Sequence, residues 1–160
     1  MKILALDPGT TKSGAVWLSD DLTVDSCAIL DNEDLLQFLT VEDSDVLAVE
    51  WIKAMGMPQS DDVIETVEWI GRFRERWGRR GPFVKITRRE VKMYICGRMD
   101  AKDPNIRQSL IDMYPKTGGG KVPQIGIKAQ PGPLFGMSSH CWSALAVGIT
   151  YLHTKRQEAA

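Results

Sequence analysis

The stretch ILALDPGTTKSGAVWL, residues 3–18, decides how the chain begins to fold. An apolar run, continuous enough to be buried on both faces, ends at Asp7 and is followed by the turn sequence Pro-Gly-Thr-Thr. A second apolar run then starts at Ser13. The pattern predicts two strands of a sheet, over residues 2–7 and 13–19, with a carboxylate where the first strand ends.

A carboxylate also ends a later apolar strand, because residues 45–50 read DVLAVE and close with Glu50. If the two strands are neighbours in one sheet, Asp7 and Glu50 lie close together at one edge. Two carboxylates that share a site repel each other unless a cation is present, and an oxygen-rich site of this kind suits Mg²⁺ or Mn²⁺. The alternative is that each acid only begins a solvated loop.

Capping residues and apolar periodicity predict the remaining elements. Ser60 caps a long helix that Gly78 ends, Thr87 caps another, and Asn32 caps a short one. The further predictions are a strand at 23–30, helices at 32–39, 60–78, 88–96, 105–114 and 138–155, and a strand at 82–87. The segment 115–136 is rich in proline and glycine, which predicts irregular structure.

The last predicted helix contains two candidate site residues. His140 and Ser143 in SSHCWSALAVGI are three positions apart, so they share one helical face. His140 is a candidate metal ligand or general base. The alternative for His140 is a capping or packed histidine.

The charge of the chain is sorted along the sequence although the net charge is only −1. Residues 1–71 hold three basic and fifteen acidic side chains, whereas residues 72–128 hold fifteen basic and five acidic ones. This asymmetry predicts a basic surface for a polyanion, unless folding mixes the two parts in space. Three scattered cysteines argue against a disulfide framework and favour the cytoplasm, and no apolar run reaches the ~20 residues of a membrane span.

Four motifs in this order resemble RuvC-type Holliday junction resolvases of the RNase H-like superfamily. ILALDPGTTKSG is similar to that family's first strand and turn, and LAVEW to its second acidic strand. ITRREVKMYICGRMDAKDPNIRQSLIDMYP is similar to its lysine-bearing segment, and HCWSALAVGI to its closing helix. The resemblance covers nearly the whole chain. The compact length and low basicity indicate a divergent, phage-borne member, whose compartment would be the bacterial host cytoplasm.

The fold that this resemblance implies is an α/β RNase H-like fold. Its five-stranded mixed sheet begins with a three-stranded meander and is flanked by helices. We expect a single nuclease domain over residues 1–156 and a frayed C-terminal tail at 157–160.

The activity that the resemblance implies is metal-dependent nicking of four-way or other branched DNA junctions, made symmetrically by a homodimer. It implies Asp7, Glu50 and His140 as the ligands of two Mg²⁺ ions, for which Mn²⁺ can substitute. Ser143 completes the catalytic set in the place where the family usually has an Asp. A hydroxyl is a poorer ligand than a carboxylate, so one metal site is expected to be weaker.

DNA contacts follow from the same resemblance. Basic side chains neutralise phosphates, and the methionines of MGMP, residues 55–58, press on unstacked bases or make core or dimer contacts. The expected DNA-binding residues are Arg88, Arg89, Lys92, Arg98, Lys102, Arg107, Met55 and Met57. The alternative for Lys102 and Arg107 is a solvated helix surface.

The long helix is the expected dimer contact, because its apolar residues exceed what one packed face needs. Those expected to face the sheet are Val63, Val67, Ile70 and Trp77, while Ile64, Trp69 and Phe73 lie elsewhere on the helix.

Two other functions are compatible with these motifs. The first is a junction-binding protein that has lost cleavage, and it is suggested by Ser143 in the place where the family usually has an Asp. The second is a fragment of an actin-like kinase, because DPGTTKSG is similar to the phosphate-binding turn of those sugar kinases. Such kinases hold their nucleotide between two domains, and 160 residues form only one, so no nucleotide cofactor is expected. No membrane partner is expected either, because no apolar run is long enough to span a membrane.

Overall fold

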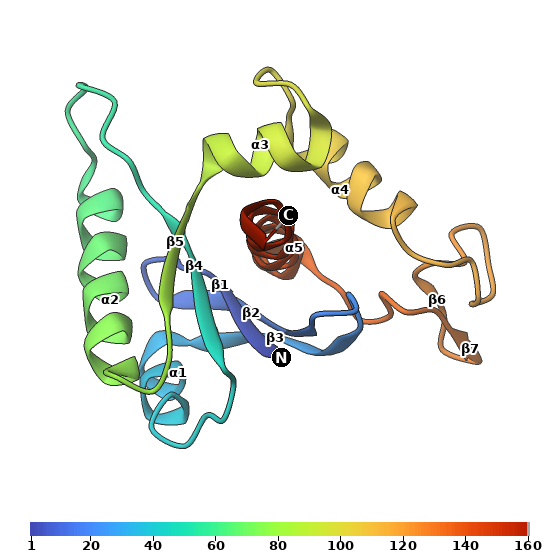
Figure 1. Cartoon of the computed structure of the whole chain (residues 1–160), viewed down its shortest axis with the longest axis horizontal. Coiled ribbons are helices and arrows are strands. Elements are labelled where there is room, and N and C mark those ends of the chain that lie inside the picture. The colour runs from blue at the N-terminus through green and yellow to red at the C-terminus, as the bar shows by residue number, and fades with distance from the viewer. Residues whose placement is uncertain (160) are drawn as a thin grey trace.

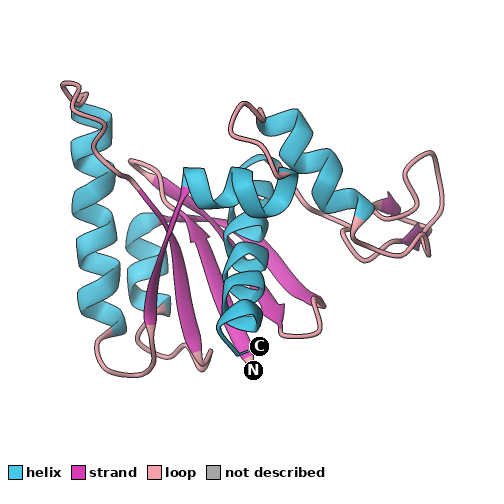
Figure 2. Cartoon of the chain, turned by 45° about the horizontal axis from the view of Figure 1, so that its top comes forward, coloured by secondary structure: helices cyan, strands magenta, loops and turns pink. Residues whose placement is uncertain are grey.

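A five-stranded mixed sheet forms the centre of the molecule, in the strand order β3-β2-β1-β4-β5 (Figures 1 and 2). The structure is a computed structural model, and it describes residues 1–159 apart from the side chains of residues 155–157 and 159. The strands are β1 (Lys2–Asp7), β2 (Lys12–Ser19), β3 (Val24–Asp31), β4 (Val46–Trp51) and β5 (Phe83–Thr87). Strand β2 is antiparallel to β1 and β3, and β4 is parallel to β1 and β5, so the predicted meander and mixed sheet are confirmed.

Helices cover both faces of this sheet (Figure 1). One face packs against α1 (Asn32–Phe38) and α2 (Asp61–Trp77). The other packs against α5 (Ser139–Ala159) and α3 (Arg88–Cys96), and α4 (Asp103–Asp112) packs against these two helices. Side chains alternate along β1, since Ile3 and Ala5 join the core under α5 whereas Leu4 and Leu6 join the core under α1 and α2. Both faces of β1 are therefore buried, as its continuous apolar run predicts.

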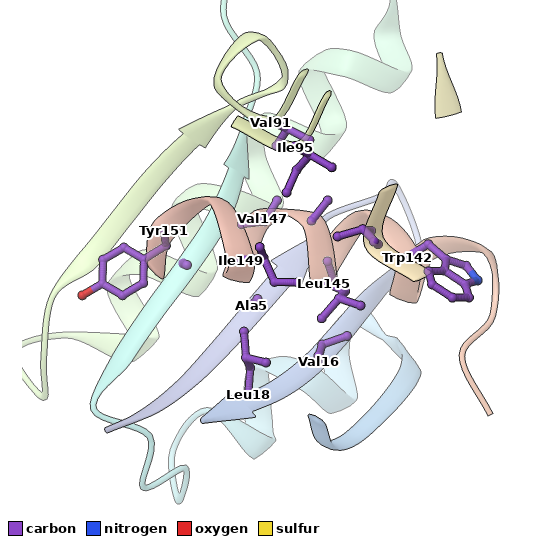
Figure 3. Packing of buried hydrophobic residues seen from close by; sticks show 14 of the residues in the cluster. Ala5, Val16, Leu18, Val91, Ile95, Trp142, Leu145, Val147, Ile149 and Tyr151 are labelled. Carbon is purple, nitrogen blue, oxygen red and sulfur yellow. The ribbon is translucent and has the colours of Figure 1, made fainter. Parts of the chain in front are cut away.

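Helix α5 lies directly on the sheet, and Figure 3 shows Leu145 and Ile149 turned toward the strands. A Cβ atom on Gly148 would lie 2.9 Å from Leu18 Cδ2 and 3.1 Å from Ala5 Cβ. The glycine thus permits a close approach between the helix and the sheet. The helix continues to Ala159, and Ala160, the last residue of the expected tail, lies outside the described residues. Within residues 1–159, no helix is long and apolar enough to cross a membrane.

Two of the predicted caps are present. The Ser60 side chain accepts a hydrogen bond from the Val63 N–H at the start of α2, and Gly78 ends that helix with a φ of 62°. Thr87 begins α3 in a capping box with Glu90. The caps satisfy backbone N–H groups at the start of each helix, and that of α3 does so directly at the end of β5.

The predicted orientation of α2 is wrong by part of a turn. Val67 was expected to face the sheet but is 41% exposed, whereas Phe73 was placed elsewhere and is fully buried. The buried stripe is Thr66, Ile70, Phe73 and Trp77. Aromatic bulk at Phe73 decides the orientation, because burying it removes more apolar surface than burying Val67.

Residues 115–138, which we call the hairpin knob, lie between α4 and α5 and are mostly irregular, as the sequence predicts for residues 115–136. Its two short strands are β6 (Gly126–Ile127) and β7 (Gln130–Pro131). A Cβ atom on Gly126 would lie 2.2 Å from the Gly132 nitrogen, so the chain crosses itself too closely for any side chain. Buried Leu134 and Gln124 anchor the knob.

Candidate active site at the carboxyl ends of β1 and β4

Asp7 and Glu50 lie on adjacent parallel strands at the same edge of the sheet. The register pairs Leu6 of β1 with Val49 of β4, and the next residue along each strand is one of the two acids. Each acid follows Ala5 or Ala48 by two positions, and both alanines belong to the core under α5. Because side chains alternate between faces, both carboxylates point to the face that α5 covers.

Glu50 is held in an environment that disfavours its charged form. Burial, followed by repulsion from Asp7 and a hydrogen bond with it, raises the pKa of Glu50 to about 8. Arg88 opposes this shift, with its Nη1 3.8 Å from Glu50 Oε1. The Glu50 side chain is only 18% exposed. The two carboxyls are therefore crowded together, and a bound cation would stabilise their charged forms.

His140 reaches the same pair from the first turn of α5. Its Nδ1 atom lies 3.0 Å from Asp7 Oδ2, across 133 residues of sequence. Gly14 of β2, which pairs with Asp7, makes this approach possible. A Cβ atom at that glycine would lie 2.4 Å from the His140 carbonyl oxygen. The structure thus brings Asp7 together with both Glu50 and His140.

A buried polar pair holds the turn that follows Asp7. Ser13 Oγ donates to Asn32 Oδ1 at 2.7 Å, and Asn32 Nδ2 donates to the Gly9 carbonyl at 2.9 Å. The Ser13 and Asn32 side chains are almost fully buried. Asn32 is therefore not the expected helix cap, which is Asp31 without a side-chain hydrogen bond. The sequence analysis did not predict these hydrogen bonds. The only feature of the sequence that could have indicated them is the polar residue Ser13 at the start of an apolar strand.

Ser143 lines a different cavity from the two acids. A cavity of about 680 Å³ includes Asp7 and Glu50 in its lining, and a neighbouring one of about 340 Å³ includes Ser143 and Asp103. Arg88 lines both cavities and also forms an ion pair with Asp103. Arg88 therefore borders both the carboxylate pair and Ser143.

Of the eight expected DNA-binding residues, four line the larger cavity: Arg88, Arg89, Lys92 and Met55. Its apolar lining also includes Trp51 and Met99, which the sequence did not single out. The other four residues lie outside this cavity. Met57 is 73% exposed, and Lys102 is exposed at the start of α4. Arg98 pairs with Asp100, and Arg107 lies over the Trp142 ring in the smaller cavity.

The donor chemistry of the larger cavity fits a divalent cation. Asp7 and Glu50 offer carboxylate oxygens in a site whose crowded charge a cation would relieve, and His140 adds a nitrogen beside Asp7. Among residues 1–159, no three His, Cys, Asp or Glu side chains are grouped so that they could hold a metal ion. The contacts are pairwise, and the ligand set Asp7, Glu50 and His140 stays a prediction.

Comparison with known proteins identifies the fold. No protein-family model matches the chain, and no curated protein matches it in sequence. The chain is similar to the structure of Thermus thermophilus RuvC, with 15% identity and a TM-score of 0.68 over 98% of this chain and 97% of that one. It is similar also to T. thermophilus RuvC in complex with a Holliday junction substrate, with 16% identity and a TM-score of 0.72 over 99% and 96%.

These likenesses show that the chain has an RNase H-like fold, as the sequence predicts. Within that class, its architecture is that of RuvC, matched over nearly the full length of both chains.

Proposed function

We propose that the chain is a divalent-metal-dependent endonuclease that nicks four-way DNA junctions. One observation carries the proposal: Asp7 and Glu50 share the carboxyl edge of β1 and β4, with His140 Nδ1 3.0 Å from Asp7. The RuvC fold supports the reaction class, and the complex of T. thermophilus RuvC with a Holliday junction substrate supports branched DNA as the substrate.

The residues of the carboxyl edge divide the chemical work. Asp7 and Glu50, with His140, would hold the cation, which when bound activates water and stabilises the departing oxygen of a phosphodiester. Asp7 also orients the His140 imidazole through Nδ1, which leaves Nε2 as the nitrogen that can ligate or move a proton.

The basic residues beside the carboxylates would bring the phosphate into the site. Arg88, Arg89 and Lys92 line the same cavity as Asp7 and Glu50. Their positive charges offset the repulsion between a DNA phosphate and the two acids. Trp51, with Met55 and Met99, would supply an apolar wall against which a base can lie.

Symmetric nicking of a four-way junction requires two active sites, and we propose a second copy of this chain as their source. Helix α2 leaves Ile64 and Val67 exposed by 59% and 41% on its outer side. With Ile52 and Val63, these residues line a shallow apolar cavity of about 180 Å³. An apolar surface of this kind suits a contact between copies.

Nicking of a synthetic four-way junction tests the proposal. We expect cleavage with Mg²⁺, none with a chelator, and little cleavage of linear duplex. Asp7→Asn should abolish cleavage and leave junction affinity within about threefold, because it removes a metal ligand but none of the basic side chains. Asp34→Asn, an exposed carboxylate change on the opposite face, is the matched control.

Two results would overturn parts of this proposal. Wild-type nicking by the Asp7→Asn variant would refute the metal assignment. A wild-type protein that binds the junction tightly but never cuts it, at any Mg²⁺ or Mn²⁺ concentration, would identify a non-catalytic junction-binding protein.

A further inference from the structure

The hairpin knob, residues 115–138, carries positive charge that the proposed active site does not use. Lys116, Lys121 and Lys128 are its charged residues, and all three are exposed. The segment contains no Asp or Glu. Its cations are therefore not neutralised by acids of its own, whereas Arg88 of α3 pairs with Asp103 and Arg98, in the loop that follows α3, pairs with Asp100.

The knob is ordered by its own backbone. The Gly118 N–H donates to the Pro123 carbonyl at 2.8 Å, and the Gly119 N–H donates to the Gln130 carbonyl at 2.9 Å. Backbone segments also pack closely against each other at Gly126 and Gly132, where no side chain would fit. Its lysines thus project from a preformed scaffold, so binding orders little additional backbone.

The knob lies on the same side of the molecule as α3 and α4 (Figures 1 and 2). In Figures 1 and 2, α3, α4 and the knob follow one another along one side, and α2 lies at the far end. The chain leaves the knob directly into α5, whose first turn carries His140. The knob therefore places three further lysines on the side of the molecule that holds α3, whose Arg88, Arg89 and Lys92 line the larger cavity (Figures 1 and 2).

We propose that the knob binds the sugar–phosphate backbone of a duplex arm of the junction, beyond the phosphate that is cut. This inference rests on the proposed function and adds a second DNA contact to it. DNA is favoured over a protein partner because the knob combines three exposed cations with no acid, which complements a polyanion. Exposed Ile127 and Phe135 are the features that a protein partner would use instead.

The test is the triple variant Lys116→Gln, Lys121→Gln and Lys128→Gln. Each phosphate contact contributes about −0.9 to the slope of log affinity against log salt, so loss of three should flatten that slope by roughly 2 to 3. Between 50 and 200 mM salt, the wild-type affinity for a junction with long arms should then fall roughly 40-fold more than that of the variant.

A matched control removes three positive charges elsewhere. The control variant is Lys2→Gln, Arg76→Gln and Arg79→Gln. Lys2 begins β1, and the two arginines lie around the end of α2, so all three are at the end of the sheet opposite Asp7 and Glu50. This control should keep most of the wild-type slope. Junctions with arms too short to reach the knob should also show no difference between the wild type and the knob variant.

The outcomes separate the two proposals. If the wild type does not bind or cut junctions, the proposed function fails. If the wild type binds and cuts, but the knob variant keeps its salt slope and its affinity for long arms, the inference about the knob is overturned. A knob variant that instead changes from dimer to monomer, measured by sedimentation, would assign the knob to a protein contact and would equally overturn it.

Discussion

Replacing Glu50 by glutamine tests the crowding of the two carboxyls without any DNA. The pKa of Glu50 is raised from 4.5 to about 8 in the folded protein. Between these values the unfolded chain has released the proton that the folded chain still binds. The free energy of unfolding therefore falls as pH rises from about 4.5 to 8, provided that no metal is bound. Glutamine is neutral and similar in shape, so Glu50→Gln should lose this dependence.

The size of the effect follows from the shift in pKa. Each pKa unit corresponds to about 1.4 kcal/mol, which would give an upper bound of about 5 kcal/mol for the whole shift. The Glu50 side chain is 18% exposed and Arg88 opposes the shift, so we expect about 2–3 kcal/mol. For a chain of this length, the melting temperature of Glu50→Gln should exceed that of the wild type by roughly 5–10 °C at pH 8.

The assay is thermal unfolding in a chelator at pH 5, 6, 7 and 8. The two proteins should melt at similar temperatures at pH 5 and diverge as pH rises. Addition of Mg²⁺ at pH 8 should raise the melting temperature of the wild type and have little effect on the variant, because the cation relieves the same repulsion. Glu65→Gln, an exposed change on α2, is the control. A variant that is no more stable than the wild type at pH 8 would refute the crowding of Asp7 and Glu50.

Two further changes test the contacts of α5. Gly14→Ala would place a methyl group against the backbone of His140, so we expect a loss of about 1–3 kcal/mol in thermal unfolding, while Gly71→Ala, which has open space, should be neutral or slightly stabilising. An unchanged melting temperature for Gly14→Ala would contradict the close contact of β2 and α5. Ser143→Asp adds a carboxylate beside Arg88 and should tighten Mg²⁺ binding in calorimetry. Unchanged Mg²⁺ affinity would mean that residue 143 does not reach the cation held by Asp7 and Glu50.

The carboxyl edge was predictable because its signals are local. Asp7 and Glu50 each end a continuous apolar run, and such runs identify buried strands. The caps at Ser60 and Thr87 are also local, since the capping side chain and its partner lie three residues apart. His140 was a candidate because it begins an apolar helix, although its contact with Asp7 depends on the whole fold.

The parts that escaped prediction depend on tertiary contacts. Arg88 was expected to bind DNA, but nothing in its neighbourhood of sequence indicates that it lies between Glu50 and Asp103. The two short strands of the hairpin knob also escaped prediction, because backbone hydrogen bonds and close approaches at glycines hold the knob together and leave no apolar periodicity in the sequence. The orientation of α2 failed because several apolar stripes were possible and only packing selects Phe73.

The contact between Asp7 and His140 also sets an order of assembly. As the chain leaves the ribosome, β1, β2 and β4 emerge long before residue 139, so the sheet can pair while the face that α5 covers is still bare. A chain in that state holds the two acids but lacks His140 and the helix that shields them. The site is therefore completed last, and any product that stops before α5 is both unable to assemble it and prone to aggregate through the uncovered face.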